Sequence, residues 1–239
     1  MPTTAALVTI GDELLAGEVT NTNASWLAAR LTERGVAVRE VRVVPDERPA
    51  IEAAVSELGA AHTHLLTTGG LGSTLDDVTL EAVAGALGRP LEPNDEARRL
   101  VDAAVAEIRE EYPTFEYDAA AGSRYPEGAR ILPNDAGISP GCVCGNVYVL
   151  PGIPAEMEAV FETVAEEFDG DVGSRTLYTE IPESHLNVTL DAAGERFAVR
   201  VGCYPDGETK RIRLVSEDVA ALDAAAAWLA RHPGIRSEE

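Results

Sequence analysis

The first 170 residues alternate short apolar runs with segments of helical periodicity, and this alternation restricts the fold more than any other feature. Runs short enough to be strands lie at residues 5–10, 36–44, 64–68 and 147–150. Between them, apolar residues recur at the spacing of amphipathic helices. Strands that alternate with helices predict an α/β fold, a three-layer αβα arrangement around a mostly parallel sheet.

Polar residues and glycines mark the predicted helix ends. Asn21, Thr22 and Asn23 offer N-caps for the first long helix, which should stop at Gly35. The next helix should close at Gly59. Residues 112–145 carry no clear period and are predicted to be loop-rich.

The sequence after residue 170 predicts a second, smaller unit. The stretch DGDVGS at residues 169–174 is a plausible hinge. Strands are expected at 175–181, 199–204 and 210–216, and helices at 185–197 and 219–231. We therefore expect a main domain at residues 1–170 and a small α+β domain at residues 171–239.

Acidic turns follow the first two predicted strands, and a glycine-rich turn follows the third. Asp12 and Glu13 come after the first strand, and Asp46 comes after the second. Ligands of open parallel sheets bind outside the carboxyl ends of the strands, so these turns are predicted to form one cleft. Residues 134–141 and 150–154 are predicted to be rigid turns that flank the last strand and complete the cleft, and the alternative that they only punctuate the chain stays equally open.

The third turn, in the sequence LLTTGGLGSTLDDVTLE at residues 65–81, has the character of a phosphate cradle. Glycines bring backbone N–H groups close to a ligand, and the helix start behind them favours anions. The hydroxyls of Thr68, Ser73 and Thr74 add donors. Asp76 and Asp77 beside phosphates point to a divalent cation between them, since Mg²⁺ typically uses one or two carboxylates plus phosphate oxygens.

Other interpretations of these motifs stay open or fail. A single Asp–Glu turn, or Asp77 alone, is more often a helix cap than a catalytic group. The Rossmann and P-loop patterns are both missing, and the sole lysine is Lys210. Residues 137–141 match the hydrolase elbow G-x-S-x-G, but Pro140 has no N–H for an oxyanion hole, so an esterase is rejected.

The net charge of -22, with 18 arginines among 19 basic residues, predicts a solvated acidic surface suited to a salt-rich cytoplasm. No basic patch is visible, which argues against a nucleic-acid partner. We expect no secretion signal and no membrane span, hence a cytoplasmic protein. Cys142, Cys144 and Cys203 are expected to be free thiols without a metal.

Five motifs in order resemble one family. They are GDELLAGEVTNTNASWLAARL, VVPDE, TTGGLGSTLDDVT, LPNDAGISPG and LPGIPAEME, within residues 4–170. Together they resemble the molybdopterin-binding domain of molybdenum cofactor biosynthesis, and within it the N-terminal domain of the competence/damage-inducible protein A group. Residues 175–231 look like the small domain that follows there. The deamidase domain often fused to that group is not found, so no deamidation is expected.

The resemblance implies a phosphate-bearing pterin or nucleotide in the cleft and assigns expected roles. Asp46 and Asp77 match the two aspartates that matter in the pterin-adenylylating relatives. The expected metal ligands are Asp12, Glu13, Asp76 and Asp77. The expected ligand-binding residues are Thr68, Gly69, Gly70, Gly72, Ser73, Thr74, Asn134, Gly137, Pro151 and Gly152.

Three functions follow as hypotheses. The first is a pyrophosphohydrolase that uses a divalent metal such as Mg²⁺ on ADP-ribose-like substrates. The second is a molybdopterin adenylyltransferase, which shares the phosphate loop but needs ATP and a pterin. The third is a non-catalytic module that binds a pterin or nucleotide. Self-association into a homo-oligomer is expected of such folds.

Overall fold

The strand that begins the fold has both of its faces buried. In β1 (Thr4–Ile10), Ala6 and Val8 pack into one apolar core, whereas Ala5 and Leu7 pack into another on the opposite side of the sheet. Side chains of a strand alternate between its faces, so a strand that is apolar at successive positions must be covered twice. This pattern is what requires a layer of helices on each side.

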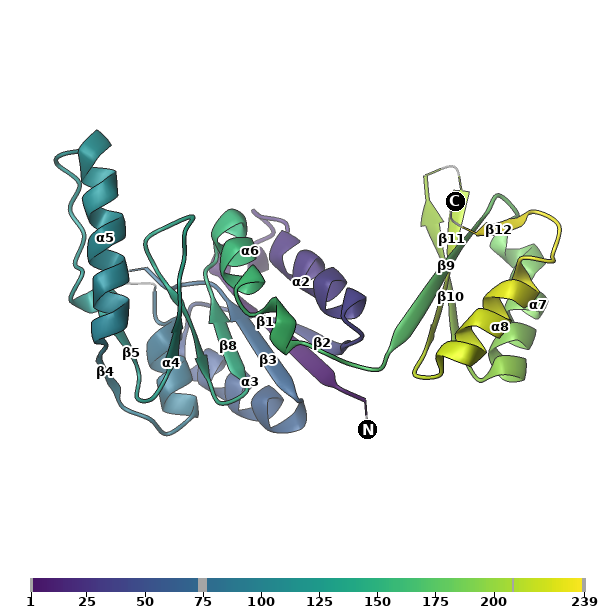
Figure 1. The fold of residues 1–239 in the computed structure, drawn as a ribbon, viewed down its shortest axis with the longest axis horizontal. Coiled ribbons are helices and arrows are strands. Elements are labelled where there is room, and N and C mark those ends of the chain that lie inside the picture. The colour runs from purple at the N-terminus through teal and green to yellow at the C-terminus, as the bar shows by residue number, and fades with distance from the viewer. Residues whose placement is uncertain (1, 73–76, 208, 238–239) are drawn as a thin grey trace. The chain divides into compact units, whose positions relative to one another are not determined.

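The computed structural model describes residues 2–72, 77–207 and 209–237. The chain divides into two compact units, residues 3–169 and residues 170–239, each described by itself (Figure 1). Within the described ranges, no helix has the length and apolar character needed to cross a membrane.

The first unit is built on a six-stranded sheet of order β2-β1-β3-β8-β7-β6. Strands β2, β1, β3 and β8 run parallel, whereas β7 is antiparallel to both of its neighbours. The predicted α/β fold with a mostly parallel sheet is therefore confirmed. The remaining strand bounds are β2 (Ala37–Val44), β3 (His64–Thr68), β6 (Arg130–Leu132), β7 (Gly141–Cys144) and β8 (Val147–Leu150).

Helices cover both faces of this sheet. Helices α3 (Arg48–Ala61) and α4 (Thr79–Ala86) contribute to one core, and α2 (Thr22–Glu33) and α6 (Pro154–Glu162) contribute to the other. The other helical segments are α1 (Asp12–Leu15), α5 (Asp95–Glu111), η1 (Ala121–Ser123) and η2 (Ala165–Glu167).

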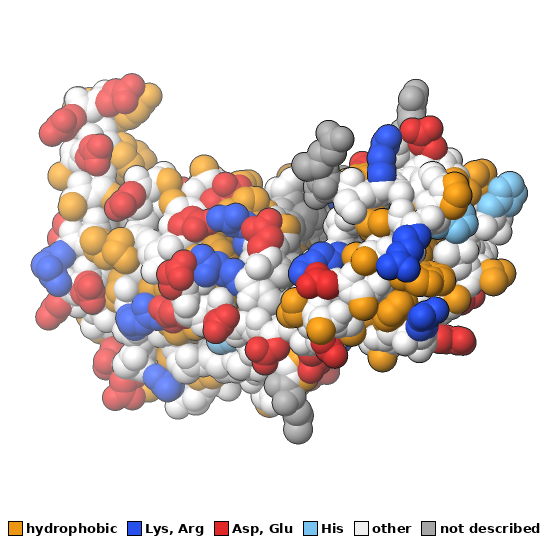
Figure 2. All heavy atoms as spheres, turned by 45° about the vertical axis from the view of Figure 1, so that its right-hand side comes forward, with side chains coloured by type: hydrophobic (Ala, Val, Ile, Leu, Met, Phe, Trp, Pro, Cys, Tyr) orange, Lys and Arg blue, Asp and Glu red, His pale blue; other side chains and the backbone are white. Residues whose placement is uncertain are grey.

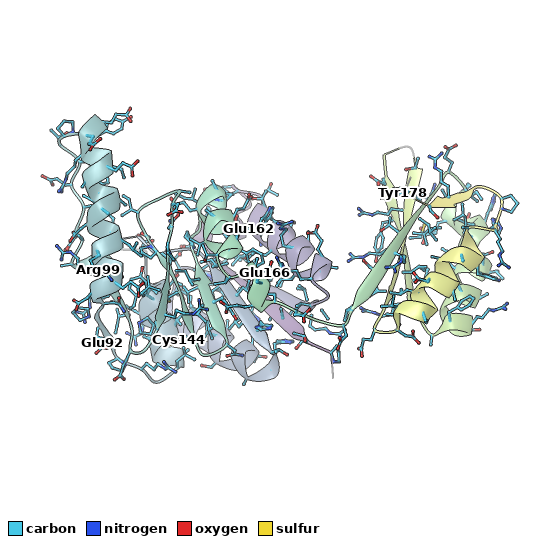
Figure 3. The ribbon with its side chains drawn as sticks, in the orientation of Figure 1. Glu92, Arg99, Cys144, Glu162, Glu166 and Tyr178 are labelled. Carbon is cyan, nitrogen blue, oxygen red and sulfur yellow. The ribbon has the colours of Figure 1, made fainter. Side chains whose placement is uncertain are left out.

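Acidic side chains at the end of α6 and beyond it form ion pairs with arginines at the C-terminal end of α2. Glu162 lies 2.6 Å from Arg30, and Glu166 lies 2.8 Å from Arg34 (Figure 3). Acidic and basic side chains are interspersed over the visible face of the molecule (Figure 2). The predicted acidic surface thus uses several of its arginines in local ion pairs.

One local prediction is wrong and another is incomplete. Helix α3 does not end at Gly59 but continues to Ala61, because the Asn146 side chain donates to the carbonyls of Gly59 and His62 at 2.9 and 3.0 Å. The stretch 112–145 is loop-rich as predicted, but it also contains the short strands β5 (Arg124–Pro126), β6 and β7. Strand β5 pairs with β4 (Leu91–Pro93).

The second unit has a four-stranded antiparallel sheet of order β10-β11-β9-β12, on which two helices pack. The chain order is strand, helix, strand, strand, helix, strand. The bounds are β9 (Gly173–Thr179), α7 (Glu183–Phe197), β10 (Arg200–Asp206), β11 (Thr209–Ser216), α8 (Val219–Leu229) and β12 (Ile235–Ser237). The small α+β unit is confirmed, although β12 was not predicted.

Candidate functional site

A cleft of about 600 Å³ opens at the carboxyl ends of the parallel strands. The loops after β1, β2, β3 and β8 all contribute to its lining, because parallel strands end at the same edge of the sheet. Every residue that lines it belongs to the first unit.

Most of the predicted site residues lie in this cleft. Those that line it are Glu13, Asp46, Thr68, Gly69, Gly70, Gly72, Asp77, Pro151 and Gly152. Asp12, Asn134 and Gly137 are not among the lining residues. Ser73, Thr74 and Asp76 lie outside the described residues.

The floor of the cleft requires glycine at two positions. Gly69 has a φ of +131°, and a Cβ there would stand 2.4 Å from the carbonyl oxygen of Ile10. A Cβ on Gly152 would stand 3.2 Å from the Cα of Gly69. The backbones after β1, β3 and β8 therefore approach one another more closely than side chains permit.

Asp46 is held by the turn after β1. Its Oδ2 accepts a hydrogen bond of 2.9 Å from the backbone N–H of Asp12, the first residue of α1. Asp46 therefore does satisfy a helix terminus, as the simpler interpretation of its turn expects, but its carboxylate also lines the cleft. Asp12 itself is exposed and takes part through its backbone N–H. It is not among the residues that line the cleft.

Asp77 precedes α4 without occupying its N-cap position. The N-cap of α4 is Val78, so Asp77 is not the N-cap residue that the alternative interpretation required. A Cβ on Gly72 would stand 2.5 Å from Oδ2 of Asp77, which shows that this carboxylate lies directly against the glycine loop.

The cleft is lined by acidic side chains, and no basic side chain lines it within the part of the chain that the structure describes. Glu13, Asp46, Asp77 and Glu156 line it, and no Lys, Arg or His stands among the described residues of its wall. A bare phosphate would be repelled by this wall, because like charges at short range raise the energy of the complex. A phosphate would therefore bind here more favourably with a cation than alone.

The described residues offer no ready-made cage for that cation. No three His, Cys, Asp or Glu side chains come together as a metal site among them. Mg²⁺ nevertheless binds through one or two carboxylates when substrate phosphates supply other oxygens. Glu13 and Asp77 both line the cleft and are carboxylates of this kind.

Two asparagines that we interpreted only as helix caps also join the strand ends. Asn21 does cap α2, through the N–H of Ala24 at 3.1 Å, and it also donates to the Thr9 hydroxyl at 2.9 Å. Asn23 donates to the Thr68 hydroxyl at 3.0 Å and to the Gly152 carbonyl at 2.7 Å. Sequence reasoning missed this role because asparagine at a helix start is already explained by capping.

A further part of the wall comes from two loops and the first turn of α6. Tyr117, Ile138, Ser139 and Glu156 line it. Asn134 lies behind and donates to Oε2 of Glu156 at 2.6 Å and to the Ser139 carbonyl at 2.9 Å. Burial raises the pKa of Glu156, and the hydrogen bond from Asn134 acts in the opposite direction.

The rejected hydrolase elbow lies in this wall. The Ser139 hydroxyl is 3.4 Å from that of Tyr117, and the Pro140 carbonyl accepts from Tyr125 at 2.7 Å. No histidine lines the cleft among the described residues, so Ser139 has no general base of that kind there. Ser139 is a structural residue of the wall.

These features define a class of protein: a three-layer α/β protein with an acidic cleft at the carboxyl ends of its parallel strands. The chain belongs to the family described as "Probable molybdopterin binding domain", which matches residues 6–169. The resemblance predicted from the five motifs is confirmed. Residues 171–235 match the domain described as "FAD synthase, middle domain".

Relatives share either the whole chain or its first unit. Protein TK1472 of Thermococcus kodakarensis is 36% identical and covers 98% of this chain and 99% of its own. A CinA-like protein of Geobacter sp. (strain M21) is 35% identical over 96% of this chain, which spans 58% of that protein. The crystal structure of the protein CinA, of unknown function, from Thermoplasma acidophilum has a TM-score of 0.62 at 30% identity, covering 70% of this chain and 98% of that one.

Proposed function

We propose that the cleft binds a phosphate-bearing pterin or nucleotide together with a divalent cation, and that it hydrolyses the pyrophosphate of ADP-ribose-like substrates. The observation that carries this proposal is an acidic wall above a close-packed glycine floor, without a basic side chain among the described residues. Such a wall suits a ligand whose negative charge arrives with its own cation.

The roles of the residues follow from their positions. Asp77 and Glu13 would hold the cation, whose charge supplies electrostatic stabilisation of the phosphoryl oxygens. Asp46, fixed by the Asp12 N–H, accepts a hydrogen bond from the attacking water. The water oxygen bonds to one phosphorus as the bond from that phosphorus to the bridging oxygen breaks. The bridging oxygen leaves with the electron pair, and the water protons pass to solvent.

The comparison of the second unit supports a particular choice of substrates. FAD and ADP-ribose are both adenine nucleotides joined to a second group through a pyrophosphate, and residues 171–235 match a domain named for FAD synthase. Both compounds should therefore be tested.

The experiment incubates the full chain with ADP-ribose or FAD and Mg²⁺, Mn²⁺ or Co²⁺ in high KCl and measures the AMP released. We expect release with at least one metal and a loss of at least about a hundredfold with Asp46→Asn, the lower range for removing an acid–base group. Glu47→Gln, in the same turn but not lining the cleft, is the matched control. No AMP from either substrate with any metal would refute hydrolysis.

Molybdopterin adenylyltransfer is a second candidate, favoured by the family description over residues 6–169. It predicts ATP-dependent adenylylation of molybdopterin that Asp77→Ala abolishes. The lack of a three-ligand metal cluster among the described residues favours a third candidate, a binding module. Saturable ligand binding without turnover of any of these substrates would decide for it. Homo-oligomer formation and a cytoplasmic location stay predictions, and the first is measured by light scattering.

A further inference from the structure

One part of the cleft wall combines a carboxylate with apolar and aromatic side chains. Tyr117 and Ile138 offer an aromatic ring and an apolar side chain, and Glu156 offers a half-buried carboxylate. We propose that this wall binds a planar heterocycle, and that Oε1 of Glu156 accepts a hydrogen bond from an N–H on its edge. The inference rests on the proposed function, because it assumes a nucleotide or pterin in this cleft.

Glu156 is held by residues far from it in the sequence. It lies in the first turn of α6, where a negative charge is favoured by the helix dipole and needs no further role. However, its Oε2 accepts the 2.6 Å hydrogen bond from Asn134. A Cβ on Gly137 would collide with its carboxylate, so the loop backbone lies directly against it. A carboxylate confined in this way is pre-oriented, which a helix dipole alone does not require.

The orientation of Asn134 determines what Glu156 presents to the cleft. The Oδ1 of Asn134 accepts from the N–H of Ala136 at 3.1 Å, and its Nδ2 donates to both Ser139 and Glu156. Because Asn134 presents a donor, the atom of residue 156 that faces it must be an acceptor. Among the described residues, Oε1 of Glu156 has no such partner, and it remains available as an acceptor in the cleft.

The neighbours of Glu156 suit a flat ring. The Tyr117 ring is stacked on Phe115 with an interplanar angle of 14°, and its hydroxyl lies 3.4 Å from that of Ser139. Tyr117 is thus fixed on two sides. Burial also raises the pKa of Glu156, and an N–H donor from a ligand would compensate for the water that burial removes. Adenine and pterin both carry an exocyclic amine, so N–H donation is their shared chemistry.

The test compares ligands that differ in that amine. Binding of AMP and of purine riboside 5′-monophosphate, which lacks the amine, is measured by calorimetry with Mg²⁺ in high KCl. We expect AMP to bind about tenfold more tightly to the wild type, the ratio that one hydrogen bond to a charged group supports. A phosphate-bearing pterin and its counterpart without the 2-amino group form a second arm that distinguishes pterin from adenine.

Glu156→Gln gives the discriminating variant. Its amide oxygen must face Asn134, so its NH₂ group faces the cleft, and the preference for the amine should fall from about tenfold to about one or reverse. Glu96→Gln, a first-turn glutamate of α5 outside the cleft, should leave the ratio unchanged. A merely structural role would weaken both ligands of a pair equally.

The outcomes separate this inference from hydrolysis. An amine preference in either arm that Glu156→Gln removes supports the inference even if no AMP is released from ADP-ribose. An unchanged preference in a variant that unfolds at the wild-type temperature overturns it, and so does the lack of any amine preference in the wild type. Neither of these two results bears on AMP release, which tests the proposed function separately.

Discussion

Replacing Gly69 with alanine should damage the protein more than a similar change at another glycine of positive φ. Gly69 has a φ of +131°, and its missing Cβ would stand 2.4 Å from the Ile10 carbonyl oxygen and 3.0 Å from the Ile10 Cβ. Gly88 has a φ of +64° with no heavy atom within 4 Å of the corresponding position. The two variants share backbone strain, but only Gly69→Ala adds a collision with the backbone of a neighbouring strand end.

The magnitude follows from these two contributions. Positive φ costs an alanine about 1–2 kcal/mol at either position. Overpacking typically adds about 1–3 kcal/mol, and here it applies to Gly69 alone. In a unit of this size, about 1 kcal/mol shifts the melting temperature by roughly 2–4 °C. Gly69→Ala should therefore melt about 2–12 °C below Gly88→Ala.

The assay needs a signal from the first unit only. The chain has two tryptophans, Trp26 in α2 and Trp228 in α8, so Trp26 fluorescence in a Trp228→Phe background reports the first unit. Equal losses of melting temperature in the two glycine variants would refute the close approach of the β1 and β3 ends.

Four further outcomes are expected. Asn23→Ala should lower the free energy of unfolding by about 1–3 kcal/mol through loss of its hydrogen bonds to Thr68 and Gly152; a change below about 0.5 kcal/mol would contradict that role. Burial lowers the pKa of His64 below its usual 6.5, so the unfolded chain is protonated at a higher pH than the folded chain. The free energy of unfolding that neutral His64 contributes above pH 6.5 is therefore lost as the pH falls. Melting curves of His64→Gln should show a weaker pH dependence. The unfolding midpoint should rise between low and molar KCl, because salt screens the repulsion within a net charge of -22. An unchanged midpoint would contradict the interpretation of the acidic surface as suited to a salt-rich cytoplasm. EDTA should abolish AMP release from ADP-ribose and excess Mg²⁺ should restore it, whereas activity that survives chelation would exclude a metal-dependent reaction.

The sequence predicts elements well where their signal is local. Strand β3 (His64–Thr68) has the predicted bounds, and the periodicity that predicted the helices is a property of neighbouring residues. Strands β5 and β6 have three residues each and are defined by partners elsewhere in the chain, so no local pattern reveals them. The end of α3 depends on Asn146, about 85 residues away, which no helix-ending rule can include.

The same distinction applies to the site. The turns at Asp46 and Gly69 could be placed together because parallel strands end at one edge of a sheet. Asn134 and Gly137, predicted as ligand-binding residues, do not line the cleft but contact the carboxylate of Glu156, which does. Their partner Glu156 is about 20 residues away in helix α6, and only the folded loop brings the three residues together.

The distribution of charge leaves the described lining of the cleft acidic. Arginines of the first unit, such as Arg30 and Arg42, are engaged with glutamates on the surface, and none of the described arginines lines the cleft. The proposed cation would offset the charge of this acidic lining when a phosphate binds. At roughly 1 M salt the Debye length is about 3 Å, so repulsion from distant charges of the acidic surface is screened. Charges in direct contact are screened much less, so dissolved salt cannot replace a cation bound between carboxylate and phosphate. Ligand affinity should accordingly respond to micromolar or millimolar divalent metal even in molar KCl, and that combination separates a bound cation from general screening.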